Sequence, residues 1–92
     1  MAYKPRDVIL VPFPFRDRLA EKTRPAIVLS GAVYNGRGDI VISAITSQPA
    51  RFATDYELLD WQIAGLAQSS TVRMLIATVA DSRGRLYGRA TD

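Results

Sequence analysis

Two clusters of polar residues in this chain have the types and spacing needed to hold a polyanion. The first is the loop Arg16–Thr23 with Arg24 directly after it, and the second is Thr46-Ser47-Gln48. The first cluster includes Arg16, Arg18, Glu21 and Lys22, and Phe13 and Phe15 lead into it. Cations with adjacent aromatic rings suit a single-stranded nucleic acid, whose phosphates need charge partners and whose bases need stacking platforms. The alternative is a solvated loop beside core aromatics; we favour it for Phe13, and for Phe15 both interpretations stay open.

The absence of histidine and cysteine limits the chemistry open to these 92 residues. Without an imidazole there is no Ser-His-Asp triad and no pair of histidines for acid/base work. Without a thiol there is no cysteine nucleophile, no disulfide and no Cys-based zinc site. Any reaction must therefore use Arg, Lys, Asp, Glu, Tyr, Ser or Thr.

Short apolar runs must position these clusters. Each run has the length of a strand, is rich in Val, Ile and Leu, and is bounded by Gly, Pro, Asn, Asp or Ser. The predicted strands are 7–11, 25–30, 39–45, 71–73, 75–79 and 85–88. Pro12 and Pro14 place the end of the first strand at an edge or an exit of the sheet. Asp60 and Gly65 are candidate N-cap and C-cap residues, so the segment between them predicts a single helical turn.

A hairpin of the second and third runs brings the two polar clusters together. The turn-forming pair Asn35-Gly36 lies between these runs. If the loop is centred near residue 35, antiparallel pairing sets Arg24, at the start of one strand, beside Thr46, at the end of the next. The sequence therefore predicts that these two residues are adjacent, to within one or two residues of register.

The chain is expected to fold as one domain, 1–92, of mainly β structure. Short strands with one helical turn indicate a small barrel or sandwich, and we favour the barrel because a closed sheet has no free edges. A hydrophobic content of 48% argues against a disordered chain. No apolar run approaches the roughly 20 residues of a membrane span, and no signal-type segment is seen at the N-terminus. We therefore expect a cytoplasmic protein with no membrane association.

Arg73 interrupts a strand-like run, so its guanidinium must reach water, a phosphate or a carboxylate. The candidate carboxylates are Asp55, Glu57 and Asp81, and pairing and phosphate contact stay equally open.

A second basic stretch lies near the C-terminus. Strand alternation predicts that Arg83, Arg85, Tyr87 and Arg89 share one face. Such a face suits RNA, or it is the charged outer face of an edge strand. We favour the edge strand.

Motifs from Asp7 to Arg89 resemble the PemK/MazF toxin family in order and spacing. The segments that carry the resemblance are Val11-Pro12-Phe13-Pro14-Phe15, Arg24-Pro25-Ala26-Ile27-Val28-Leu29-Ser30, Tyr34-Asn35, Gly38-Asp39-Ile40 and Ile45-Thr46-Ser47-Gln48. Three later segments resemble one branch of the family: Asp60–Leu66, Ser70–Arg73 and Ala77–Val79.

The resemblance implies an SH3-like barrel of the PemK/MazF/CcdB type, usually a homodimer. It implies a toxin of a type II toxin–antitoxin pair, a sequence-specific endoribonuclease that cleaves single-stranded RNA (mRNA) without a metal or any other cofactor. The products would be a 2′,3′-cyclic phosphate and a 5′-OH. It also implies a cognate antitoxin, a segment of which covers the RNA site.

The family's catalytic Arg and Thr correspond to Arg24 and Thr46. Because an Arg pKa above ~12 makes a poor base, we assign Arg24 to charge stabilisation. Thr46 would donate its hydroxyl to a phosphoryl oxygen, and Glu21 is a candidate for taking the 2′-OH proton. The expected substrate-binding residues are Phe15, Arg16, Arg18, Glu21, Lys22, Ser47, Gln48 and Arg73.

The chain departs from the family where it stops at Ala90-Thr91-Asp92, since family members continue into a C-terminal helix. An inactive, toxin-like protein that only binds RNA, an antitoxin or gyrase is therefore the alternative. Gyrase poisons of the CcdB type use an aromatic-bearing C-terminal helix, which argues against that form of the alternative. An SH3-like module for Pro-rich peptides is a third interpretation, but it leaves the basic loop unexplained.

Overall fold

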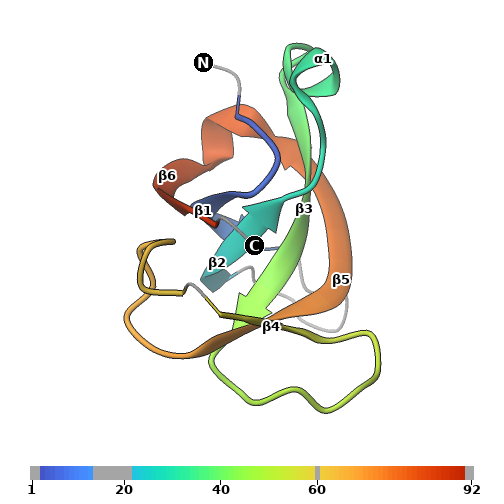
Figure 1. Ribbon diagram of the computed structural model, residues 1–92. Coiled ribbons are helices and arrows are strands. Elements are labelled where there is room, and N and C mark those ends of the chain that lie inside the picture. Colours follow the sequence, from blue (N-terminus) through green and yellow to red (C-terminus); the bar gives the residue numbers. More distant parts are fainter. Residues whose placement is uncertain (1–2, 14–21, 60, 91–92) are drawn as a thin grey trace.

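Six antiparallel strands make up one sheet. The computed structural model describes residues 3–13, 22–59 and 61–90. The strands are β1 (Asp7–Phe13), β2 (Lys22–Val28), β3 (Asp39–Thr46), β4 (Tyr56–Leu58), β5 (Ser70–Ala80) and β6 (Arg85–Arg89), with a short helix α1 (Ala32–Asn35) and a 3-10 turn η1 (Asp81–Arg83). Their order across the sheet is β4-β5-β3-β2-β1-β6 (Figure 1). The predicted mainly β fold is confirmed.

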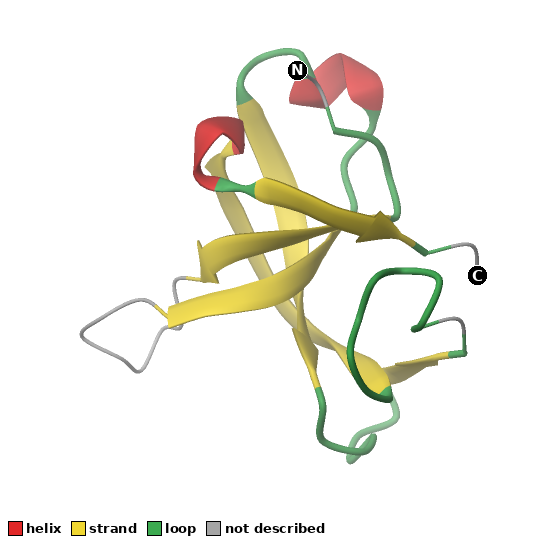
Figure 2. Cartoon of the chain, turned by 90° about the vertical axis from the view of Figure 1, so that its left-hand side faces the viewer, coloured by secondary structure: helices red, strands yellow, loops and turns green. Residues whose placement is uncertain are grey.

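The sheet curls into a barrel-like shape (Figure 2). Buried side chains lie on both of its faces. Successive residues of a strand point to opposite faces. Val8 and Ile27 accordingly belong to one buried cluster, while the neighbouring pair Ile9 and Ala26 belongs to the other. Burial on both faces explains why the first run is continuously apolar and does not alternate with polar residues.

Two glycines let a turn bridge the two edge strands, β4 and β6. In the turn 61–66, Leu66 N–H donates to Trp61 O at 3.0 Å and Gly65 N–H to Gln62 O at 3.1 Å, with Gly65 at φ +89°. This is the bonding of a Schellman cap, as the C-cap prediction for Gly65 implies. The turn is too short to form a helix, and Asp60 lies outside the described residues. A Cβ on Gly88 would lie 1.9 Å from Ala64 O, so this contact between turn and β6 requires glycine.

The predicted hairpin register is correct, but its turn is not the expected tight one. β2 and β3 pair Ala26 with Ala44 and Val28 with Ile42, which is the register that the loop centre implied. The connection, however, contains α1, and Asn35 is its last residue. Its buried side-chain amide donates to Tyr3 O at 2.6 Å and to Ser30 O at 3.0 Å. Asn35 therefore stabilises the connection through distant backbone, not through a turn conformation.

Strand β5 is one element where the sequence predicted two. Its pairing with β3 shifts between Ser43, which faces Ile76, and Ile45, which faces Val72. The resulting bulge spans residues 73–75, and Ser43 Oγ donates a hydrogen bond to Arg73 O inside it. The short strand β4 was not predicted. None of the helical segments among the described residues is long and apolar enough to cross a membrane.

Candidate functional site

A cavity of about 630 Å³ opens where β2 and β3 diverge. Pairing between these strands stops at Ala26 and Ala44. The next residue of β2 is Pro25, which has no N–H to continue the ladder. Beyond that point Arg24, Pro25, Ile45 and Thr46 all line the cavity. Pro25 thus helps to open the cavity, and Arg24 directly before it brings a guanidinium group to the cavity lining.

Arg24 and Thr46 line the same cavity, as the hairpin prediction requires. Continuing the β2–β3 register by two residues sets them opposite one another. Thr46 Oγ1 accepts the N–H of Gln48 at 3.2 Å, which leaves the hydroxyl hydrogen available to donate. Among the described residues, no carboxylate pairs with Arg24. The pair therefore offers a bound anion a guanidinium fork and a hydroxyl donor.

Arg73 reaches the cavity from β5 and is held by the loop after β3. Its Nη2 lies 3.4 Å from Pro49 O and 4.0 Å from Asp55 Oδ2, and its guanidinium lies 5.9 Å from the centre of the Phe52 ring. Asp55 Oδ2 also accepts the N–H groups of Arg51 and Phe52. These backbone hydrogen bonds, opposed by burial and helped by the charge of Arg73, hold the pKa of Asp55 below its ordinary value. Of the three candidate carboxylates, Asp55 is the one that Arg73 meets.

The cavity lining has a positive charge balance. Its charged side chains are Arg24 and Arg73, and no Asp or Glu is among the described residues that line it. The other polar lining residues are Thr46, Ser47, Gln48, Gln68 and Ser70. A site with two guanidinium groups, hydroxyls and amides suits a phosphate-bearing ligand.

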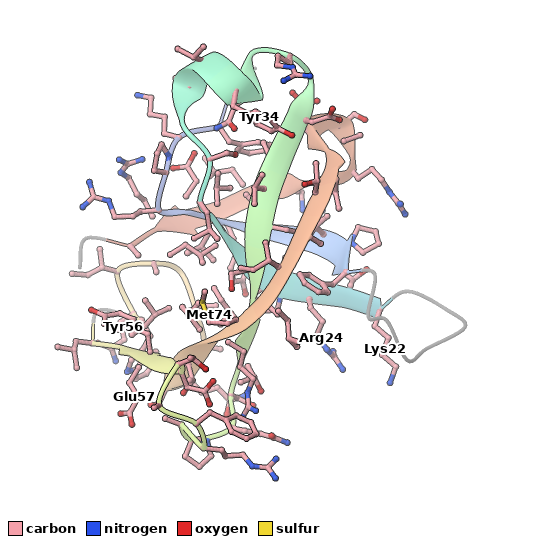
Figure 3. All side chains as sticks on the ribbon, turned by 90° about the vertical axis from the view of Figure 1, so that its right-hand side faces the viewer. Lys22, Arg24, Tyr34, Tyr56, Glu57 and Met74 are labelled. Atoms are coloured by element: carbon pink, nitrogen blue, oxygen red, sulfur yellow. The ribbon has the colours of Figure 1, made fainter. Side chains whose placement is uncertain are left out.

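The remaining predicted site residues fall into three groups. Ser47 and Gln48 line the cavity beside Thr46. Lys22 is not part of the lining, although it projects from β2 on the same side as Arg24 (Figure 3). The other four, Phe15, Arg16, Arg18 and Glu21, lie outside the described residues.

Tyr87 and Gln68 line the cavity, and neither was predicted to do so. The alternation expected for residues 83–89 is wrong, because Arg83 lies in η1 and β6 carries a bulge. Arg85 pairs with Leu10 and Arg89 with Asp7, so these two arginines face opposite sides. Arg89 Nη1 also contacts Asp7 Oδ1 at 2.9 Å, in keeping with the structural role favoured for this edge strand. In the sequence, the only feature that pointed to a binding role for Tyr87 was its aromatic ring among neighbouring arginines.

Comparisons with known proteins give a family and a fold that this chain resembles. The family model described as PemK-like, MazF-like toxin of type II toxin–antitoxin system matches residues 4–91. A comparison with curated protein sequences gave no match. The crystal structure of MazF (Form-I) from Deinococcus radiodurans is similar at 23% identity and a TM-score of 0.76, over 99% of this chain and 84% of that one. Two crystal forms of MazE-MazF from the same organism have 20% identity and TM-scores of 0.73 and 0.72, covering 99% of this chain and 82% and 83% of theirs. At such identities the likeness in structure shows the fold alone.

Proposed function

Because the chain belongs to the PemK-like, MazF-like toxin family of type II toxin–antitoxin systems, we propose that it is an endoribonuclease that cleaves single-stranded RNA. One observation carries the proposal: Arg24, which no described carboxylate neutralises, lines a cavity together with Thr46, and the described lining of that cavity contains no carboxylate. The site is built to attract a phosphate and to stabilise additional negative charge on it. A peptide-binding groove would not need this charge balance.

In the proposed reaction the 2′-oxygen attacks the adjacent phosphorus while the bond from phosphorus to the 5′-oxygen breaks. The products are a 2′,3′-cyclic phosphate and a 5′-OH. The Arg24 guanidinium donates to the phosphoryl oxygens as their charge rises, and the Thr46 hydroxyl donates to one of them. Arg73, Ser47 and Gln48 hold the flanking backbone. The 2′-OH must lose a proton, and Glu21 is our candidate acceptor because the described cavity lining offers no carboxylate.

The test is cleavage of a long single-stranded RNA in EDTA, with the ends of the products identified. We expect Arg24→Ala to lower the rate by about 10²- to 10³-fold, the loss typical of a removed charge-stabilising donor. Arg37→Ala is the matched control, since Arg37 stacks on Tyr34, which lies well away from Arg24 (Figure 3). Undiminished cleavage by Arg24→Ala, or products with other ends, would refute the proposed chemistry.

A toxin-like protein that binds RNA without cutting it is the second candidate. The absence of a general base among the described lining residues favours it. The same assay separates the two: RNA that is bound by the parent chain but yields no product in EDTA supports the inactive form.

We further propose a protein partner and a second copy of the chain. Two similar structures are MazE-MazF complexes, so a cognate antitoxin that covers the cavity and blocks RNA is expected. A homodimer would cover some of the apolar surface of β5, where Met74, Leu75 and Ile76 are all exposed. Light scattering at several concentrations measures the oligomeric state. We also propose a cytoplasmic location, because the proposed substrate is RNA.

A further inference from the structure

Tyr87 is the aromatic residue of the cavity that the proposed reaction does not use. Leu86 pairs with Ile9 and Gly88 with Val8, so Tyr87 is the additional residue of the β6 bulge. Its side chain lines the same cavity as Arg24 and is 43% exposed. Within the described ranges, the hydroxyl has no hydrogen-bond partner and the ring has no cation stacked on it. Bulges beside functional sites commonly redirect a side chain.

The backbone beneath Tyr87 is fixed by close contacts. A Cβ built on Gly65 would lie 2.6 Å from Tyr87 O, and one on Gly88 would lie 1.9 Å from Ala64 O. The turn 61–66 therefore packs directly on the main chain of residues 87 and 88. An exposed ring on a backbone held this tightly is suited to be a stacking platform, because little of its freedom is lost on binding.

The cavity that Tyr87 and Arg24 share also has apolar lining residues. Leu10 of β1 lies between the two strands, since it pairs with Pro25 on one side and with Arg85 on the other. Leu10 and Pro25 both line the cavity next to Tyr87. The described lining thus combines aromatic and aliphatic residues with Arg24 and Thr46.

From these positions we propose that Tyr87 forms a nucleobase subsite, in which the base next to the phosphate held by Arg24 stacks on the phenol ring. Strand β1 lies between the strands that carry Arg24 and Tyr87. Arg24 is opposite a position on β1 that is two to three residues away from the position opposite Tyr87, so the two backbones lie on the order of 13 Å apart. Both residues line one cavity of about 630 Å³, and we take the space between them to hold a single nucleotide. The Gln68 amide, also on the lining, can donate to and accept from the edge of that base.

A nucleobase fits this subsite better than an apolar side chain of a peptide. The subsite shares its cavity with Arg24, which no described carboxylate pairs with, so its occupant must carry an anion on one end and a flat apolar face on the other. A nucleotide has both features, and stacking tolerates any base because each has a π-face. The subsite rests on the proposed function in one respect: it takes the anion at Arg24 to be an RNA phosphate.

The test is binding of a short 2′-O-methyl RNA, which cannot be cleaved, to the folded parent chain and its variants by fluorescence anisotropy. Tyr87→Leu is expected to weaken the affinity by about 5- to 100-fold, as loss of one stacked base does. Tyr87→Phe keeps the ring and is expected to stay within about twofold of the parent. Tyr34→Leu, which removes an aromatic ring far from the cavity (Figure 3), is the control and should leave the affinity unchanged.

A second probe, an abasic oligonucleotide of the same length, separates stacking from a structural role. Its affinity should be equal for the parent chain and for Tyr87→Leu, because only the phosphates are bound. Three outcomes would each overturn the subsite. Tyr87→Leu could lose the same affinity for both probes, Tyr87→Phe and Tyr87→Leu could lose the same affinity for the 2′-O-methyl RNA, or neither variant could lose any affinity. If the parent chain still cleaves RNA in any of those cases, the proposed function stands without the subsite. If the expected pattern appears in a chain that does not cleave, the subsite stands and the catalytic proposal fails.

Discussion

Replacing Gly88 by alanine tests the contact that closes the gap between the edge strands. The new Cβ would lie 1.9 Å from Ala64 O and 2.9 Å from Gly65 N, and all of these atoms belong to main chain. Ordinary van der Waals contact begins near 3.4 Å. The turn 61–66 must therefore move away from β6 by about 1.5 Å, which neither a rotamer change nor a flexible side chain can absorb.

The expected loss of unfolding free energy is about 3 kcal/mol, at the upper end of the usual cost of overpacking, because two backbones clash. For a chain of this size that loss lowers the Tm by about 12 to 24 °C. Moving the turn also uncovers Ala64 and Leu66, which belong to the buried cluster on that face. The same shift frees the backbone of Tyr87, so RNA affinity should fall together with stability.

Thermal and urea unfolding followed by circular dichroism measure the effect. Gly31→Ala is the matched control: Gly31 has φ −83°, and a Cβ there would meet nothing within 4 Å. Its unfolding free energy should lie within about 1 kcal/mol of the parent value. If Gly88→Ala were as stable as Gly31→Ala, the close approach of turn and β6 would be refuted.

Three further substitutions test other features of the fold. Arg6 has φ +74°, so Arg6→Gly should leave unfolding free energy unchanged or raise it by up to about 1 kcal/mol, whereas Arg6→Val should lower it by about 1–2 kcal/mol; urea titrations of both variants check the sign. The pKa of Asp55 is lower in the folded chain than in the unfolded one. Its contribution to stability is therefore complete above the unfolded value of about 3.9 and is lost as the pH falls below it; unfolding curves at pH 7 and pH 3 should show a smaller acid loss in Asp55→Asn than in the parent. Ser43→Ala leaves the Arg73 carbonyl in the β5 bulge without its donor; it should cost about 1–2 kcal/mol in urea unfolding, and a cost near zero would mean that the bulge does not need this bond.

Local pairing rules were sufficient for the centre of the site. Arg24 and Thr46 lie on neighbouring strands joined by a short connection, so their adjacency follows from counting residues away from the loop. The count succeeded although the connection contains α1 and not a tight turn, because the centre of the loop sets the register. Pro25, visible in the sequence, also marks where the ladder ends and the cavity begins.

Long-range contacts decided the rest of the site. Arg73 and Tyr87 line the cavity from within bulges, and each bulge contacts a residue far away in the chain: Ser43 for β5 and Gly65 for β6. Strand alternation cannot foresee an inserted residue, because one insertion reverses the face of every residue after it. Likewise Asp55 reaches Arg73 only because β4 pairs with β5. The sequence by itself determined most of the strands, the hairpin register that brings Arg24 and Thr46 together, and the types of polar residue available; the tertiary structure alone decided which other residues join these two in one cavity.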